Sequence, residues 1–315
     1  MSNIWYIQVN RICNNQCLFC SNPSNENNIS RDKGVEYIEE LILRWYTWVV
    51  FTWWEPTLSP DLLYWIQYAK EKNIESRIIS NWSITSDIGY VKWLKDSGLS
   101  LIHLSIYSHI PKVHDFLTWN QWSFKKLIAS IWNCLKVWLD ININTVINHY
   151  NQNHLDKLIL FLTRNFPQIK HFIWNNLDPI MLQENELSRS TLPDFLIFEN
   201  SLRKAVELLS SMQKTFRIER VPLCYMRGFE FASTETRKIV KDEERFVYFL
   251  DFREALRQSW RFWTNDKLPE CELCSLNPIC AWIYELKGNY SYVKAIPQAL
   301  SDIEINAIIR KITDE

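Results

Sequence analysis

Apolar and polar positions follow two alternating periods over the first two-thirds of the chain. Short apolar runs rich in β-branched and aromatic residues are typical of buried parallel strands, and they lie at 4–9, 48–52, 75–80, 101–106, 139–146 and 170–174. Segments with a helical repeat lie between them, near 33–44, 59–72, 86–96, 121–137 and 153–165. Six strand–helix pairs in succession predict a parallel α/β sheet, either open or partly closed as a barrel.

The pattern changes after about residue 215. A helical segment near 196–212 is followed by shorter strand-like pieces such as 245–250, then by a group of cysteines and a last helical stretch at 300–312. We therefore divide the chain into a barrel domain, 1–215, and a smaller α+β, cysteine-rich extension, 216–315. Active sites of such barrels lie at the carboxyl ends of the strands, so the segments that follow the strands are the candidates for chemistry.

Tryptophan and glycine occur in unusual numbers, 16 and 5 in 315 residues. An average protein has glycine at ~7%, which would be about 22 residues here. Several tryptophans stand where glycine is usual, at strand exits, helix ends and polar loops: Trp45, Trp53, Trp54, Trp82, Trp119, Trp122 and Trp138. We interpret this as a gene that uses UGA for glycine and that was translated with UGA as tryptophan. A protein that is truly rich in tryptophan is the alternative.

Charge and hydropathy narrow the class of protein. The chain has 35 basic and 36 acidic residues with no long basic stripe, so we predict no nucleic-acid partner. No apolar run approaches ~18 residues, which predicts no membrane span, and the N-terminal segment is too short and polar for a signal peptide. These features favour a cytoplasmic location. Eight cysteines there indicate metal or redox chemistry rather than structural disulfides.

Three cysteines lie in the loop directly after the first predicted strand. Cys13, Cys17 and Cys20 have the spacing C-x3-C-x2-C within one loop. Three thiolates hold three corners of a [4Fe–4S] cluster and leave the fourth iron open to another ligand. A zinc site or a chance cluster is the alternative, but zinc usually takes paired cysteines or added histidines, and no histidine lies nearby.

The loop sequence CNNQCLFC, with Phe19 before its last cysteine, resembles the signature of the radical SAM superfamily. The segment WWEP, residues 53–56, is similar to that family's GGEP motif with both glycines replaced. The resemblance covers about 1–180 and implies a partial (βα)6 TIM-like barrel. It also implies that S-adenosylmethionine (SAM) binds the open iron of the [4Fe–4S] cluster. Reductive cleavage of SAM would then give a 5′-deoxyadenosyl radical that abstracts a substrate hydrogen.

The resemblance also implies which residues bind SAM. Glu55 would orient the SAM amino group, Ser105 in LSIYS would lie near its ribose or carboxylate, and the segment SNWS matches the exit of the third strand. Thr118 falls where many members carry a SAM-contacting arginine, so that contact is unassigned. The implied cofactor-binding residues are Phe19, Trp53, Trp54, Glu55, Pro56, Asn81, Ser105 and Asn144.

A second cysteine group lies in the extension. Cys271, Cys274 and Cys280 have the spacing C-x2-C-x5-C, which resembles the SPASM extension of the same family. The family pattern continues to a further cysteine, but here that position is Tyr284, and Cys224 is the candidate fourth ligand. The resemblance implies one auxiliary [4Fe–4S] cluster in a shortened, Twitch-like extension, with Trp282 where a glycine beside the cluster is expected. A structural zinc site with four cysteines is the alternative.

The family likeness predicts a radical SAM enzyme that modifies a peptide or protein. Oxidation or rearrangement of a small molecule, as in cofactor maturation, is the alternative. A reductant such as ferredoxin or flavodoxin is the implied partner. Two other classes stay open, a non-catalytic iron–sulfur protein for electron transfer or binding, and a zinc-stabilised binding module. Asn175, Asn176 and Asp178 end the last barrel strand and either line the substrate side or form a turn.

Overall fold

A computed structural model of the chain describes residues 4–20, 27–177, 182, 185–250, 256–259, 267–282 and 293–314. Strands and helices alternate through its first two-thirds, as the periodicity predicts. The strands are β1 (Ile4–Gln8), β2 (Trp48–Thr52), β3 (Glu75–Ser80), β4 (Leu99–Ser105), β5 (Asp140–Ile147), β6 (His171–Asn176), β7 (Thr215–Glu219), β8 (Glu244–Tyr248) and β9 (Leu256–Ser259). The helices are α1 (Arg31–Leu43), α2 (Leu62–Glu71), α3 (Ile88–Ser97), α4 (Pro111–Thr118), α5 (Ser123–Lys136), α6 (Leu155–Asn165), α7 (Glu186–Arg189), α8 (Phe195–Ser211), α9 (Thr234–Lys241) and α10 (Asp302–Thr313).

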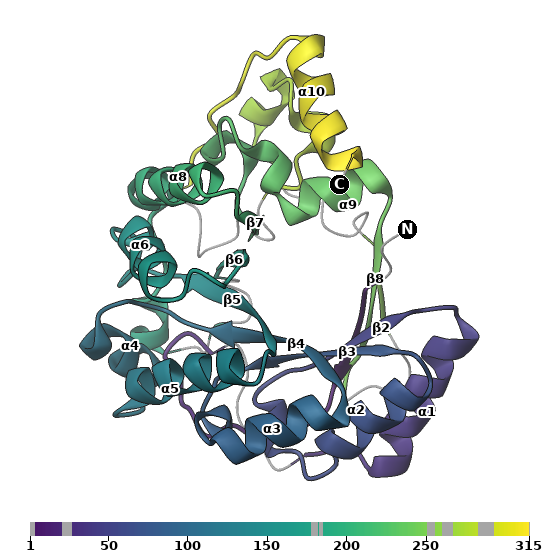
Figure 1. Cartoon of the computed structure of the whole chain (residues 1–315). Coiled ribbons are helices and arrows are strands. Elements are labelled where there is room, and N and C mark those ends of the chain that lie inside the picture. The colour runs from purple at the N-terminus through teal and green to yellow at the C-terminus, as the bar shows by residue number, and fades with distance from the viewer. Residues whose placement is uncertain are drawn as a thin grey trace.

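The described strands form one sheet in the order β7-β6-β5-β4-β3-β2-β1-β8-β9. All neighbouring strands are parallel except β8 and β9, which are antiparallel. Figure 1 shows the sheet curving round, with α1 to α6 and α8 on its outer side and with α9 and α10 between its two ends. The architecture is a partial barrel, as predicted for an α/β chain of this pattern.

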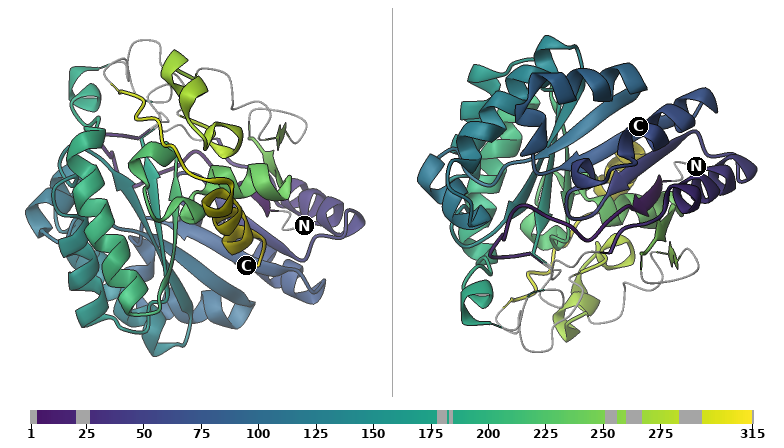
Figure 2. Two further views of the ribbon diagram at one scale, coloured as in Figure 1. Left: turned by 90° about the horizontal axis from the view of Figure 1, so that it is seen from above. Right: turned by 90° about the horizontal axis from the view of Figure 1, so that it is seen from below.

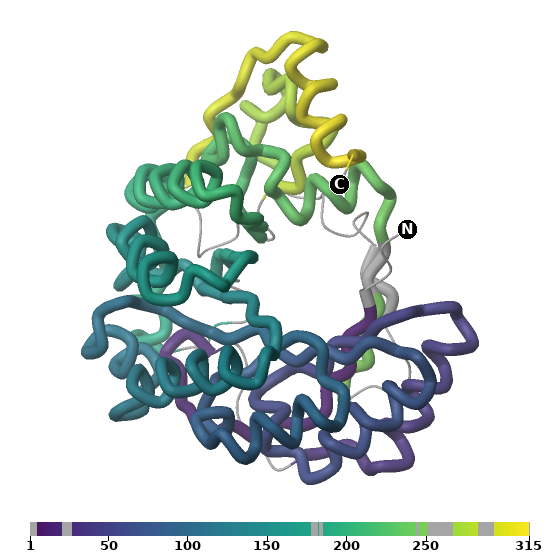
Figure 3. Tube along the Cα trace, viewed as in Figure 1, coloured from purple at the N-terminus to yellow at the C-terminus, as the bar shows by residue number. Residues whose placement is uncertain are grey.

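The predicted count of six parallel strands is too low by two. β7 pairs with β6 and extends the series, and β8 pairs with β1 on the other side. Figure 3 shows the start of the chain and the segment near residue 245 running side by side, although they are far apart in the sequence. Residues after 215 therefore contribute three strands to the same sheet. The division into domains 1–215 and 216–315 stays a prediction.

Burial along the central strands alternates strictly. In β5, Ile141, Ile143, Thr145 and Ile147 are buried on the outer face, while the residues that alternate with them are only half-buried. Strands β3 and β6 follow the same alternation. Only the outer face is covered by helices, so it needs apolar side chains, whereas the inner face carries polar ones such as Asn142 and Asn144. The fold therefore encloses a polar interior beneath the strand ends.

The C-terminal part packs across the open side of the sheet. Figure 2 shows it covering that side when the molecule is seen from above. Helix α9 contacts β7 and α10. Gln298 joins two of its loops, because its side chain donates to the Leu223 carbonyl oxygen at 3.1 Å and its carbonyl oxygen accepts from the Ser275 amide at 2.9 Å.

No helix in the described ranges has both the length and the apolar character that a bilayer crossing requires.

Candidate active site

The cysteine loop directly after β1 is held by the end of α4. The Gln16 amide donates to the Thr118 carbonyl oxygen at 3.2 Å, and the Leu18 amide donates to the Leu117 carbonyl oxygen at 3.0 Å. Phe19 is buried and packs edge-on against Tyr107, with ring centroids 4.8 Å apart. Backbone bonds and an aromatic contact thus fix the loop without using its thiols.

Cys13, Cys17 and Cys20 line a cavity of about 320 Å³. Burial raises the pKa of the Cys13 thiol to about 11 and raises the pKa of Cys17, with the neighbouring cysteines adding to the effect. The Asn15 amide and the Asn81 side chain both donate to Cys13 Sγ, at 3.4 and 3.5 Å. A bound metal favours thiolates over thiols, and such donors then stabilise the thiolate charge. Three soft sulfur donors facing one cavity fit an iron–sulfur cluster.

Glu55 fixes the exits of β2 and β3 relative to each other. Its carboxylate is fully buried and accepts hydrogen bonds from the Thr57 amide at 3.1 Å, the Thr57 hydroxyl at 2.5 Å, the Ser80 hydroxyl at 2.9 Å and the Asn81 amide at 2.5 Å. Burial raises its pKa, although these donors act in the opposite direction. Asn81, which reaches the Cys13 sulfur, is therefore positioned through Glu55.

Most of the predicted cofactor-binding residues meet at the cavity, but three do not. The cavity is lined by Phe19, Trp53, Trp54, Asn81 and Ser105. Glu55 and Pro56 are buried behind the wall and are not among the lining residues, so the contact between Glu55 and the SAM amino group stays a prediction. Asn144 lines the adjoining interior of the sheet, where its side-chain oxygen accepts from the Asn175 amide group at 2.5 Å.

The sequence model of the radical SAM superfamily matches residues 7–162. This range starts within β1, ends within α6, and includes the cysteine loop and the exits of the first five strands. The chain belongs to the radical SAM superfamily. Members of this superfamily are enzymes.

The chain is also similar to a curated protein and to solved structures. It is 24% identical over 233 residues to the Fe-coproporphyrin III synthase of Methanosarcina barkeri, covering 72% of this chain and 53% of that protein. The chain thus spans about half the length of this relative. Streptococcus suis SuiB bound to S-adenosylmethionine superposes with a TM-score of 0.63, at 17% identity, over 89% of this chain and 72% of SuiB. Native anSMEcpe with bound AdoMet gives a TM-score of 0.66, at 16% identity, over 99% and 96% of the two chains.

Eight tryptophans of this radical SAM chain have a backbone conformation that is typical of glycine. Twelve described residues other than glycine have a positive φ, and eight of them are tryptophans, whereas the other six described tryptophans are not among them. A bulky side chain in this conformation is a steric outlier. The eight are those that sequence and motif arguments placed at glycine positions: Trp45 (62°), Trp53 (77°), Trp54 (34°), Trp82 (66°), Trp119 (48°), Trp122 (69°), Trp138 (57°) and Trp282 (61°).

Two of these tryptophans crowd the cavity that Cys13, Cys17 and Cys20 line. The rings of Trp53 and Trp54 both line it, with centroids 6.3 Å apart. A third, Trp82, is fully buried, and its indole nitrogen donates to the Ser105 carbonyl oxygen. Glycine at these positions would open the cavity and free the Ser105 carbonyl oxygen.

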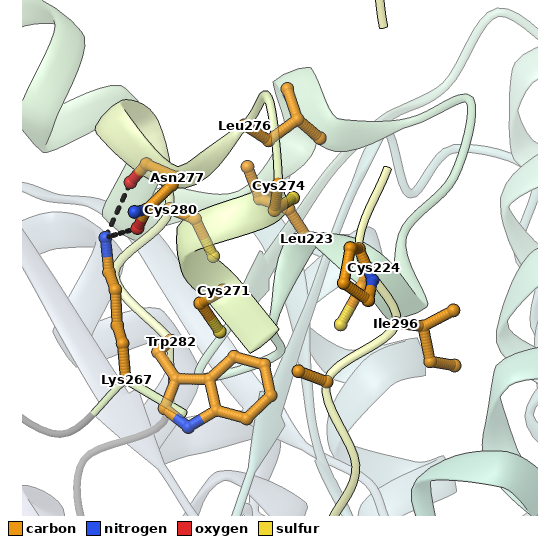
Figure 4. Close-up of a pocket in the computed structure, with 12 residues that line it drawn as sticks. Leu223, Cys224, Lys267, Cys271, Cys274, Leu276, Asn277, Cys280, Trp282 and Ile296 are labelled. Carbon is orange, nitrogen blue, oxygen red and sulfur yellow. Dashed lines mark hydrogen bonds between the residues drawn. The ribbon is translucent and has the colours of Figure 1, made fainter. Parts of the chain in front are cut away.

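The second cysteine group also lines one pocket. Figure 4 shows Cys224, Cys271, Cys274 and Cys280 around it, with the Trp282 indole at its edge. Burial raises the pKa of Cys224 to about 12 and also raises the pKa of Cys280. The Gln298 amide donates to Cys274 Sγ at 3.4 Å. Tyr284, the departure from the SPASM pattern, lies outside the described residues.

Neither cysteine group is drawn tightly together. In the part of the chain that the structure describes, no three side chains of His, Cys, Asp or Glu are placed to hold a single metal ion.

Sequence reasoning overlooked Arg220 and the hydroxyl network around Thr118. Arg220 follows β7, has a φ of 61° and lines both the cysteine cavity and the interior of the sheet. It gave no signal because β7 was not recognised. Thr118 is fully buried and bonds to Ser123 at 2.8 Å, so it contributes to the loop rather than to the cavity. Asn175 and Asn176 do line the cavity, and Asp178 lies outside the described residues.

Proposed function

We propose that this radical SAM protein cleaves SAM reductively and removes a hydrogen atom from a peptide or protein substrate. The observation that carries the proposal is the meeting of Cys13, Cys17 and Cys20 with the exits of β2, β3 and β4 around one cavity. A [4Fe–4S] cluster held by these thiols would supply the electron and the open iron that SAM chemistry needs. The reductant would be a small electron-transfer protein such as ferredoxin or flavodoxin.

The protein's own residues would bind SAM and keep water away. Asn81 and Ser105 present polar groups from the exits of β3 and β4, and Phe19 and Tyr107 form an apolar wall beside the thiols. Glu55 acts as a positioning residue through Asn81. Exclusion of water and side reactions is the usual contribution of a protein to cofactor chemistry of this kind.

Two comparisons bear on the choice of substrate. SuiB has been solved with its precursor peptide SuiA, and anSMEcpe with the Cp18Cys peptide. Both likenesses support a peptide or protein substrate for this chain. The likeness to Fe-coproporphyrin III synthase supports the alternative, a small molecule modified during cofactor maturation.

We also propose that the pocket formed by Cys224, Cys271, Cys274 and Cys280 holds an auxiliary [4Fe–4S] cluster in a SPASM- or Twitch-like extension. Four thiols around one pocket, one from Cys224 and three from the segment 267–282, match a cluster that takes one thiolate at each iron. A single zinc ion, with Zn–S bonds of about 2.3 Å, would draw four sulfurs to within about 4 Å of one another. Iron, sulfide and zinc analysis of the purified protein distinguishes the two, and zinc without sulfide would overturn the cluster.

We propose, further, that glycine is the natural residue at the eight left-handed tryptophans. The support is the coincidence of three independent signals: the positive φ, the glycine deficit, and the family motif at Trp53 and Trp54. Peptide sequencing by mass spectrometry on protein from the natural host tests it. Glycine at these positions and tryptophan at Trp65 are expected, and tryptophan at Trp53 would overturn it.

A matched pair of proteins tests the enzymatic function. One is the chain as written, and the other has glycine at the eight positions. Both are reconstituted anaerobically with iron and sulfide, reduced, and given SAM, and 5′-deoxyadenosine is measured. We expect product from the glycine chain alone, because two indoles overpack the SAM site. A glycine chain that holds both clusters and yields no product would favour an electron-transfer or binding protein.

A further inference from the structure

A second cavity lies inside the curved sheet, directly next to the cysteine cavity. Its volume is about 550 Å³, within the usual range for small-molecule sites. Its wall consists of the inward-facing residues of the strands together with side chains of α9. The two cavities share wall residues, namely Thr52, Trp53, Ile79, Asn175 and Arg220. A molecule bound in this inner cavity would therefore border the site of SAM chemistry.

The wall of the inner cavity has more cations than anions. Five cationic side chains and three carboxylates line it, an excess of two positive charges, whereas the whole chain has a net charge of −1. The cations are Arg77, Arg217, Arg220, Arg237 and Lys238, and the carboxylates are Glu219, Glu235 and Glu243. The positive charge is thus concentrated where the strands face inward.

Two of the three carboxylates interact with other residues of the wall. Glu243 forms an ion pair with Arg237 at 3.2 Å, and Glu235 accepts a hydrogen bond from the Arg220 amide at 3.1 Å. Both carboxylates are buried, as is Lys238. Burial also raises the pKa of Glu235, although the neighbouring Lys238 acts in the opposite direction. Glu75, which is not among the lining residues, pairs with Arg77 at 2.9 Å, so the group as a whole keeps an excess of one positive charge.

His103 also lines the inner cavity. Burial, with the neighbouring His171 and Arg77 acting in the same direction, lowers the pKa of His103 to about 3. His103 is therefore neutral near pH 7 and does not add to the charge. Asn142 and Asn144 complete this part of the wall with neutral donors and acceptors.

Physical chemistry indicates what such a cavity binds. A concave wall of low dielectric focuses the field of like charges and draws in ions of the opposite sign. Arginine presents a planar fork of N–H donors that matches a carboxylate. Arg77 on β3, whose Nε also pairs with Glu75 at 2.9 Å, and Arg217 on β7 stand on strands well separated in the sheet order, so they suit two separate acidic groups.

We propose that the inner cavity binds the substrate through two or more of its carboxylate groups. This inference rests on the proposed function, because it places the substrate beside the SAM site. Carboxylates come either from acidic residues of a peptide or from a polycarboxylate small molecule. The same wall chemistry serves both sources, and the experiment separates them.

The test compares two double variants of the glycine chain after reconstitution. Arg77→Gln with Arg217→Gln removes two cations from the cavity, and Arg164→Gln with Arg310→Gln removes two exposed cations elsewhere. The probes are coproporphyrin III and a short glutamate-rich peptide, with the porphyrin tetramethyl ester and the glutamine version of the peptide as neutral counterparts. Binding is followed by tryptophan fluorescence, folding by circular dichroism, and 5′-deoxyadenosine formation without substrate reports the SAM site separately.

We expect one acidic probe to bind the parent and the control variant alike, and to bind the cavity variant at least about tenfold more weakly. Which probe binds identifies the source of the carboxylates. Equal binding by both double variants, equal binding of the neutral counterpart, or no binding of either acidic probe would overturn the proposal. Loss of 5′-deoxyadenosine formation in the parent would instead count against the proposed function.

Discussion

Glycine substitutions at two exposed tryptophans should change the free energy of unfolding in opposite directions. They therefore test whether the left-handed backbone positions favour glycine. Trp45 lies just beyond α1 with a φ of 62° and 92% of its side chain exposed. Trp93 lies within α3 and is 61% exposed. Replacing either one by glycine removes the same indole from water, so the two substitutions differ mainly in the backbone conformation that they meet.

The expected magnitudes follow from that difference. A left-handed residue with a side chain costs about 1–2 kcal/mol, and glycine loses about 0.5–1 kcal/mol more than alanine through backbone entropy on folding. Trp45→Gly should therefore raise the free energy of unfolding by about 0.5–1 kcal/mol. Trp93→Gly should lower it by about 0.5 kcal/mol, because glycine is the poorer helix former.

Urea unfolding followed by far-UV circular dichroism measures both variants against the parent. The midpoint should move up for Trp45→Gly and down for Trp93→Gly. A second pair, Trp138→Gly beyond α5 and Trp132→Gly within it, should repeat the pattern. Midpoints that fall in all four variants would refute the claim that these left-handed positions belong to glycine.

Three further predictions concern the site and its supports. Cys17→Ser should lower the iron content by about four atoms and abolish 5′-deoxyadenosine formation, whereas Cys271→Ser should lower iron equally by loss of the other cluster; unchanged iron in either protein contradicts the assignment. Glu55→Gln places an amide donor against the donors that the buried carboxylate accepts, so urea unfolding should show a loss of about 1–3 kcal/mol, and an unmoved midpoint argues against its positioning role. Burial lowers the pKa of His114 to about 3, whereas its pKa in the unfolded chain is about 6.5. The stability of the folded protein is therefore highest above pH 6.5 with respect to this group, and it falls as the pH drops from 6.5 toward 3. Between pH 7 and 5 the loss is about 2 kcal/mol, and His114→Gln should remove it from the pH dependence of the urea midpoint; an identical pH dependence in the variant would show that His114 does not carry it.

The sequence predicted β1 to β6 and a strand-like piece at 245–250, where β8 lies, but it missed β7 for a physical reason. The first strands have outward faces covered by helices, so they contain continuous or alternating apolar residues. In β7, only Phe216 and Ile218 face the core, while Arg217 and Glu219 face the inner cavity. A five-residue strand with charges on alternate positions does not resemble a buried parallel strand until its partners are known.

At the candidate site, positions that require a special backbone conformation were easier to predict from the sequence when a motif or a helix end marked them. Helix ends and strand exits require a left-handed residue at fixed places, so Trp53 and Trp138 were assigned correctly from their neighbours. Arg220 and Gln213 have the same conformation, but no motif and no compositional signal marks either position. Contact between Glu55 and SAM was expected from the motif alone and stays a prediction, and the motif does not report that the Glu55 carboxylate also accepts from Ser80 and Asn81.

The position of β1 within the sheet links the cysteine loop to the order of synthesis. β1 is made first, yet it lies between β2 and β8 and pairs with both. A nascent chain gains the β2 partner early, but the other edge of β1 stays unpaired until Tyr248 has left the ribosome. Pairings of such long sequence separation form slowly. The thiols at the tip of β1 therefore acquire their final support among the last steps of folding, and a chain truncated before β8 leaves them on an edge strand open to oxidation and aggregation.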